Sequence, residues 1–293
     1  ADPEVTQSTV QVTRKRRRES GGRVGDYRRD LVERMVEQMF NERFGELARK
    51  RDAKFLAAGV NAGVLSPEVN TFTMAARVQD GALADGLSAL AIEAKRVGEF
   101  GFGASELDRA KRWMAAFYER AYSERDKTES GSFAQEYLNH FLSDEPSPGI
   151  EYEYRLVQQV LPGITVDDAS TLARERLAAD SRVVLAVSPE KAGISPPVDA
   201  DLRAAFSSAE AVAVTAWTDT TTLRELLEKK PEPAAVESRR ELADLGVTVV
   251  RFANGVETWL KPTDFKNDQV LSLIPIVACT ALETAGDAQV LLD

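Results

Sequence analysis

The chain has 293 residues, of which 43% are hydrophobic and 29% charged, a composition that excludes a disordered protein and suits one large domain or two ordinary ones. A formal net charge of −10 argues against general nucleic-acid binding, and no apolar run is long enough to span a bilayer. The single cysteine, Cys279, excludes an internal disulfide and leaves the redox compartment open.

The N-terminal region predicts a strand that ends in a basic run. The chain begins at Ala1 without a methionine or an apolar leader, which is typical of a piece of a longer protein. Polar and apolar residues alternate from Ser8 to Thr13, and Arg14 to Arg18 are all basic. Such a run could bind phosphate or direct nuclear import. We interpret it instead as the solvated, charged end of the strand, which keeps a sheet from pairing with other chains.

Hydrophobic spacing predicts helices and strands in alternation over the next hundred residues. Apolar residues three and four apart indicate helices, small apolar residues with glycines indicate a closely packed strand, and strict alternation indicates a half-buried strand. In chain order these are a helix at 26–50, strands at 55–64 and 70–79, and helices at 82–100 and 104–125.

The following segments complete a mixed arrangement of helices and strands. Thr165 and Asp168 are spaced as a capping pair for a helix at 166–179, and an apolar strand follows at 182–187. This order of elements predicts a fold of the α+β class. We expect one mostly antiparallel sheet that is covered by helices on one face.

The C-terminal third of the chain has a different character. Residues 212–244 contain prolines and little periodicity apart from a short helix near 222–229, and they predict an extended linker. Two short β runs at 247–252 and 256–261 flank an Asn-Gly pair and predict a hairpin. The residues after residue 246 are too few for a second domain with its own core.

The histidine count restricts the chemistry of this chain. His140 is the only histidine in the sequence, and it lies among apolar residues at helical spacing. Most hydrolytic zinc sites need two or three imidazoles, and a serine or cysteine nucleophile usually needs a histidine as its base. We interpret His140 as structural, and we assign no catalytic, cofactor-binding or metal-binding residue to this chain.

Two acidic clusters are alternatives for a metal or acid–base site. Glu151 with Glu153, and Asp167 with Asp168, each precede an apolar pattern of helical spacing. Carboxylates in the first turn of a helix complement its dipole, so we interpret both clusters as structural. The mixed charges of 119–129 predict a solvated helix face, with the lining of a closing cleft as the alternative.

Five separated stretches carry a combined pattern that is more specific than any one of them. They are Gly25 to Leu31, Phe40 to Leu47, Gly98 to Lys111, Pro148 to Tyr154, and Leu245 to Asp268. In this order and spacing they resemble the pitrilysin/insulinase family of zinc metallopeptidases, in its bacterial form related to mitochondrial processing peptidase.

The resemblance implies a parent protein of four domains that share one α/β fold and form two halves. The halves close like a clamshell over an unfolded peptide. Residues 1–210 then correspond to the non-catalytic second domain of the N-terminal half, 211–245 to the linker between the halves, and 246–293 to the truncated start of the third domain. The implied partners are peptide substrates, the missing catalytic domain and the C-terminal half of the same protein.

The family's zinc motif, His-x-x-Glu-His, belongs to the first domain. Its two histidines bind zinc, and its glutamate activates the attacking water. A chain with one histidine cannot hold this motif. The resemblance therefore implies zinc in the parent protein, at a site outside this chain, and no zinc bound by this chain.

Two positions depart from the family pattern. Gly103 stands where relatives often have a threonine that caps the long helix, and glycine is an acceptable but weaker cap. Residues 270–293 lack the glycine-rich turn that relatives show after the third strand. The predicted hairpin and the apolar stretch 271–279 should associate with another surface, because an isolated hairpin is marginally stable in water.

Two functions are consistent with these features. The chain is either the non-catalytic, substrate-enclosing module of a zinc metalloendopeptidase or a module of an inactive, peptidase-like partner subunit. We favour the first, because single-chain bacterial forms that keep both halves usually keep the zinc motif. No pattern in the sequence identifies the substrate, the oligomeric state, or a periplasmic as opposed to a cytoplasmic location.

Overall fold

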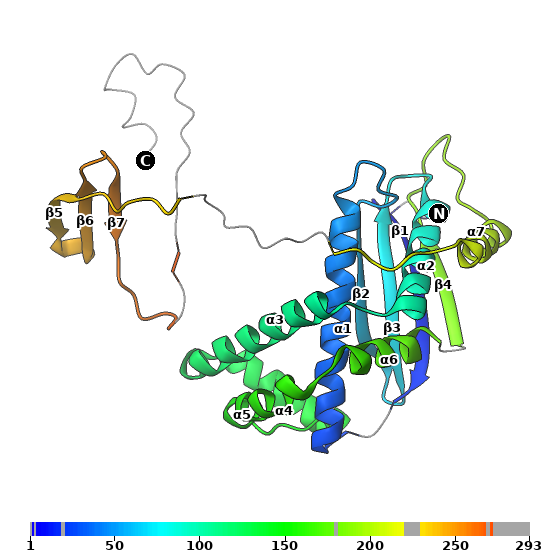
Figure 1. Ribbon diagram of the computed structural model, residues 1–293, viewed down its shortest axis with the longest axis horizontal. Coiled ribbons are helices and arrows are strands. Elements are labelled where there is room, and N and C mark those ends of the chain that lie inside the picture. The colour runs from blue at the N-terminus through cyan, green and yellow to red at the C-terminus, as the bar shows by residue number, and fades with distance from the viewer. Residues whose placement is uncertain are drawn as a thin grey trace, which may run out of the picture.

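A computed structural model describes residues 2, 4–18, 21–178, 181–219, 229–267 and 270–271. These residues form a four-stranded sheet with its helices and a second, three-stranded sheet (Figure 1). The elements in chain order are β1 (Ser8–Arg17), α1 (Val24–Ala48), β2 (Ala57–Ser66), β3 (Val69–Val78), α2 (Leu83–Phe100), α3 (Ala104–Ser123), η1 (Arg125–Lys127), α4 (Ser130–Ser143), α5 (Ile150–Val160), α6 (Val166–Leu177), β4 (Ser181–Val187), α7 (Asp199–Ala211), β5 (Val236–Leu242), β6 (Val247–Phe252) and β7 (Glu257–Leu260).

The larger sheet has the strand order β2-β3-β1-β4, and all its neighbouring strands are antiparallel. Val10 lies opposite Ala76 on one side and Ala186 on the other, so one face of the sheet carries a continuous apolar surface. Helices α1, α2 and α6 lie over this face (Figure 1). The predicted α+β class, with a mostly antiparallel sheet covered by helices, is therefore confirmed.

The apolar stripe of α1 fixes this helix on the sheet. Phe40 and Phe44 are fully buried and their rings stack at 6.2 Å. The ring of Phe40 also meets the ring of Phe72 on β3 at 6.2 Å, and that of Phe102, between α2 and α3, at 5.3 Å. Aromatic side chains bury large areas, so this cluster joins α1, the sheet and the α2–α3 corner in one core.

Most of the predicted helices and strands are confirmed, with ends that differ by no more than two residues. Helix α7 and strand β5 were not expected. Helix α7 has a short apolar pattern, and strand β5 is mostly charged and exposed. The helix expected at 222–229 and the apolar stretch at 271–279 lie almost entirely outside the described residues.

The interpretation of the basic run as a solvated strand end is wrong for two of its residues. β1 continues to Arg17, and Arg14 is only 4% exposed. The guanidinium of Arg16 forms an ion pair with Glu33 of α1 at 3.1 Å. Because side chains alternate along a strand, every second residue of the run points toward the helices and not toward water.

The predicted hairpin is confirmed as β6 and β7, and β5 pairs with the other side of β6. Gly255 in the turn has a φ of 85°, a conformation that glycine adopts without steric cost. After β7 the chain returns to the C-terminal end of α3, where the Asn267 side chain donates to the Ser123 carbonyl at 3.0 Å and to Asp126 at 2.6 Å. The C-terminal unit thus contacts the first unit through this segment.

Helix α3 extends away from the sheet and packs against α5 (Figure 1). The rings of Tyr122 and Tyr154 stack at 4.7 Å between them. Helix α4 buries none of its residues, and Tyr137 and Phe141 on it are largely exposed.

Within the part of the chain that the structure describes, no helix is both long enough and apolar enough to cross a membrane.

Two glycines of α2 should respond in opposite ways to alanine substitution. A Cβ on Gly86 would lie 2.4 Å from Cγ1 of Val78, whereas a Cβ on Gly98 would meet no atom within 4 Å. We expect Gly86→Ala to destabilise the protein by about 1–3 kcal/mol through overpacking. Gly98→Ala should stabilise it by up to ~1 kcal/mol, because alanine favours the helix. Urea denaturation of both variants measures the difference, and equal effects would contradict the close packing of α2 on β3.

Candidate functional site

The polar residues noted in the sequence lie at helix surfaces and helix starts. His140 is exposed on α4, and its Nδ1 lies 2.7 Å from the Glu145 carbonyl oxygen. Glu151 and Glu153 are in the first turn of α5, as predicted. The phenol of Tyr27 donates a hydrogen bond to Glu153 at 3.3 Å.

The predicted capping pair at the start of α6 is confirmed. Asp168 accepts a hydrogen bond from the Thr165 backbone at 2.7 Å, and Thr165 accepts one from the Asp168 backbone at 3.1 Å. Asp168 also pairs with Arg28 of α1 at 2.8 Å. The bond to Arg28 lowers the pKa of Asp168 to about 2. Asp167 beside it lies in the same first turn, and the ion pair between Asp168 and Arg28 holds α6 against α1.

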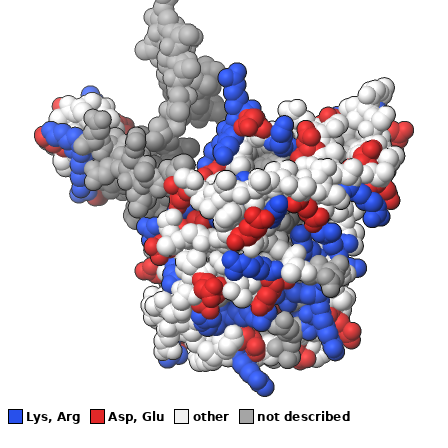
Figure 2. Space-filling model, turned by 45° about the vertical axis from the view of Figure 1, so that its right-hand side comes forward, with Lys and Arg blue, Asp and Glu red and all other residues white. Residues whose placement is uncertain are grey.

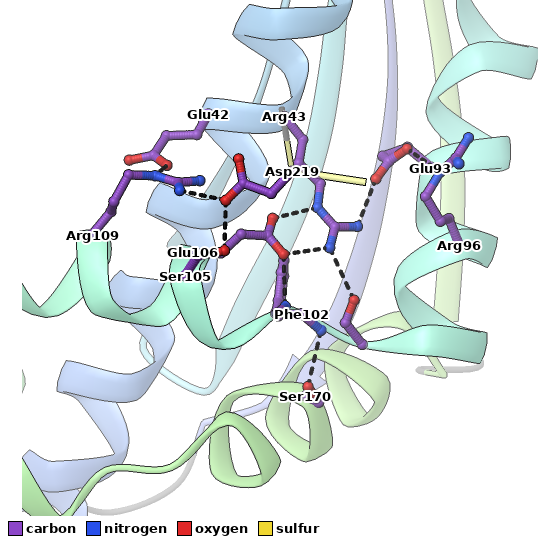
Figure 3. A network of polar contacts seen from close by, with 12 residues as sticks. Glu42, Arg43, Glu93, Arg96, Phe102, Ser105, Glu106, Arg109, Ser170 and Asp219 are labelled. Atoms are coloured by element: carbon purple, nitrogen blue, oxygen red, sulfur yellow. Dashed lines mark hydrogen bonds and ion pairs between the residues drawn. The ribbon is translucent and has the colours of Figure 1, made fainter. Parts of the chain in front are cut away.

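Among the described residues, no group of three or more histidine, cysteine, aspartate or glutamate side chains is placed to hold a metal ion. The polar centre of the first unit is instead a buried ion network around Arg43 of α1 (Figure 3). Its guanidinium bonds to Glu106 of α3 through Nε at 2.6 Å and to Glu93 of α2 through Nη1 at 2.9 Å. It also donates to the Gly101 carbonyl at 3.0 Å.

The sequence places each member of this network by local rules. Glu106 is the third residue of α3, and it accepts a hydrogen bond from the Gly103 backbone at 2.7 Å, so the glycine departure leaves the helix start intact. Gly101 has a φ of 69° and ends α2. A Cβ on it would lie 2.4 Å from Oγ of Ser170, which accepts from the Phe102 backbone at 3.1 Å.

Burial and charge pairing oppose each other in this network. Burial raises the pKa of Glu93 above its ordinary value, although its bonds to Arg43 and Arg96 favour the carboxylate. Burial alone would lower the pKa of Arg43, but its bonds to Glu106 and Glu93 hold it above the ordinary value. Arg96 lies 2.8 Å from Glu93, so two cations and two carboxylates balance in the interior.

Sequence reasoning did not find this network. Arg43 and Glu106 both lie in stretches that carry the family resemblance, but nothing in the sequence shows that the two stretches meet. The one signal in the sequence was the position of Arg43 inside the apolar stripe of a helix. A buried arginine is stable only when carboxylates pair with it. The network is structural, since its groups are buried and satisfied by one another.

The uncovered face of the sheet is a candidate contact surface of the first unit. On this face Thr13 lies opposite Thr73 and Val183, and their neighbours in the next row are Gln11 and Leu185. Val183 and Leu185 are nearly half exposed, and the others are half-buried. The face is therefore polar in the middle and apolar at the β4 edge.

On the side of the molecule shown in Figure 2, basic and acidic side chains are intermixed, and neither charge dominates the surface. A depression of about 580 Å³ at the end of the sheet has the same mixture of charges. Arg17 and Arg29 line it together with Asp30 and Glu68. Basic and acidic side chains thus offset one another in this depression.

Comparison with known proteins gives one relative by sequence and several by structure. The chain is 29% identical over 248 residues to a protein of Arabidopsis thaliana named "Zinc protease PQQL-like", with 85% of this chain and 23% of that protein covered. No family model matches the chain.

Two solved structures have the same fold. The periplasmic protease PqqL from Escherichia coli superimposes with a TM-score of 0.67 and 17% identity, over 89% of this chain and 29% of that chain. A predicted insulinase family protease from Yersinia pestis superimposes with a TM-score of 0.62 and 14% identity, over 71% of this chain and 44% of that one. This chain spans less than a third of the plant and Escherichia coli proteins.

The fold is that of the insulinase-like proteases. Together with the similarity to the plant protein, this fold supports the resemblance of the chain to the pitrilysin/insulinase family of zinc metallopeptidases. The resemblance found in the sequence is thereby confirmed.

The buried network predicts a large loss of stability on substitution of Arg43. Replacement by leucine leaves Glu106 buried without its cation, so Arg43→Leu should cost about 3–5 kcal/mol. Arg112→Leu is the matched control, because Arg112 is exposed on α3 and donates to the Asp108 carbonyl of its own helix. It should change the free energy of unfolding by less than about 0.5 kcal/mol. Equal effects in guanidinium denaturation would show that the network is not formed.

Glu37 on α1 predicts a pH dependence of stability. Burial raises its pKa from 4.5 to about 7, helped by nearby Glu33 and opposed by the Ala62 backbone and Arg34. The unfolded chain ionises near pH 4.5 and the folded chain near pH 7, so unfolding releases a proton between these values. The Glu37 contribution to stability is complete below about pH 4.5 and is lost as the pH rises to 7.

Glu37→Gln should remove this dependence, because glutamine keeps an acceptor for the Ala62 backbone and does not ionise. We expect the variant to be more stable than the parent at pH 8 and to show a flatter stability curve between pH 4.5 and 7. Thermal unfolding at several pH values measures both. Glu119→Gln, at an exposed position of α3, is the control and should leave the curve unchanged. A parental slope in Glu37→Gln would refute the assignment.

Proposed function

We propose that this chain is the non-catalytic, substrate-enclosing part of a zinc metalloendopeptidase whose two halves close over unfolded peptides. Residues 1–210 would be the second domain of the N-terminal half, 211–245 the connection between the halves, and 246–293 the start of the third domain. Zinc would be bound elsewhere in the parent protein.

The similarity to the Arabidopsis thaliana zinc protease over 248 residues carries this proposal. It extends over most of this chain and less than a quarter of that protein, which supports a parent several times longer. The sequence adds that a chain with one histidine cannot contain the two-histidine zinc motif of the family. A catalytic centre of this type would have to come from another part of the parent.

The geometry of the sheet supports a role in enclosing a peptide. Helices occupy one face, while the centre of the opposite face presents threonine, glutamine and small apolar side chains, with Lys15, Arg17 and Arg77 toward its ends. A mixed surface of this kind can contact extended peptides of many sequences, since no charged side chain lies at its centre.

The parent protein provides the test. We expect the codons upstream of Ala1 to encode His-x-x-Glu-His, and the purified parent to bind one zinc ion and cleave an unfolded peptide in a chelator-sensitive manner. A variant with glutamine in place of the motif glutamate should bind zinc and lose cleavage. The present chain, purified alone, should do neither.

A parent without the motif, or one that binds zinc without cleaving any peptide, would contradict the proposal. The first result would favour the alternative, an inactive peptidase-like partner subunit. Peptidase activity of the present chain by itself would contradict both.

A further inference from the structure

Residues 212–219 follow α7 and lie across helices α2 and α3 as an extended strap. The strap has no regular secondary structure, and side chains of α2 hold its backbone. Lys95 Nζ donates to the carbonyl oxygens of Glu210 and Val212, both at 2.7 Å, and Arg96 donates to that of Thr215 at 3.0 Å. These bonds fix the path of the chain but would accept almost any sequence, because they involve only carbonyl groups.

Two strap side chains make contacts that depend on their identity. The ring of Trp217 lies near three cations, with Arg43 at 5.2 Å, Lys50 at 5.6 Å and Arg96 at 5.8 Å from its centroid. An aromatic face attracts cations at this range, so Trp217 packs directly on the buried network. Among these cations, Arg43 and Arg96 are held in place by Glu93.

Asp219 closes the strap on α3. Its carboxylate accepts from Arg109 at 2.6 Å and from the Ser105 hydroxyl at 2.6 Å (Figure 3). Arg109 also bonds to Glu42 of α1 at 3.0 Å, which keeps its guanidinium oriented toward the strap. The surface under the strap thus offers cations, and the strap supplies an aromatic ring and a carboxylate two residues apart.

We propose that residues 212–219 form a latch, in which Trp217 and Asp219 fasten the outgoing chain to the first unit. The contacts of the described chain with the first unit then extend to Asp219 and do not stop at Ala211. The inference rests on the proposed function only where it treats this segment as the connection between two halves. In the proposed parent protein, the latch would shorten the segment that connects the two halves. It would also fix the point at which this segment is attached to the first unit.

The latch also links the connection to the core, because Trp217 contacts the same Arg43 that joins α1, α2 and α3. Release of the strap would uncover Arg43 and Arg96, whose pairing with Glu93 would become more accessible to water. A force applied to the chain after Asp219 would therefore act first on the corner between α2 and α3.

The test uses the full chain with Trp217 as its only tryptophan, through Trp113→Phe and Trp259→Phe. Asp219→Asn and Lys95→Met each remove latch contacts, whereas Asp108→Asn is the matched control at an exposed position of α3. We measure acrylamide quenching of Trp217 fluorescence and the rate of elastase cleavage within 212–216. The thermal midpoint checks that each variant remains folded.

Loss of a charge-assisted hydrogen bond should raise the cleavage rate on the order of tenfold and the quenching constant about twofold in both latch variants. Asp108→Asn should match the parent. The latch is refuted if Asp219→Asn and Lys95→Met, still folded, show parental quenching and cleavage. These readouts need neither metal nor peptide, so their failure is distinct from a failure of the peptidase test on the parent protein.

Discussion

The burial of one guanidinium governs the architecture of the first unit. Arg43 lies in the apolar stripe of α1 and is 1% exposed, so it cannot reach water. The free energy of burying an unpaired charge is far larger than the stabilisation from one helix contact. The folded chain must therefore place carboxylates next to Arg43. Glu93 of α2 and Glu106 of α3 meet that demand. This requirement fixes three helices relative to one another.

A second buried ion network lies toward the N-terminal end of α1. Glu33 is buried there and pairs with Arg16 of β1 at 3.1 Å and with Arg176 of α6 at 2.5 Å. One network thus joins α1 to α2 and α3, and the other joins it to the sheet and α6. Apolar packing supplies most of the stability, while the directional bonds of these networks select one arrangement of the helices.

This arrangement determines which surfaces remain for function. Because the helices gather on one side, the sheet keeps its opposite face at the surface, and because Arg43 and Arg109 anchor the strap, the outgoing chain follows a defined path. The proposed role, to enclose a substrate without acting on it, needs these two properties, a broad contact face and a fixed connection to the rest of the protein. The resemblance of the chain to a family of zinc metallopeptidases fits the proposed division of roles.

The sequence by itself determined most of the helices and strands, the α+β class and the family resemblance, because these depend on local periodicity, capping residues and the order of motifs. It could not show that Arg43 meets Glu93 and Glu106, since these residues are 50 and 63 positions away along the chain. Nor could it show that Arg14 and Arg16 point inward or that Trp217 returns to α1 and α2. Those facts depend on which faces pack together. Only the tertiary structure decided them, because the energy of a buried charge depends on partners that are distant in sequence and close in space.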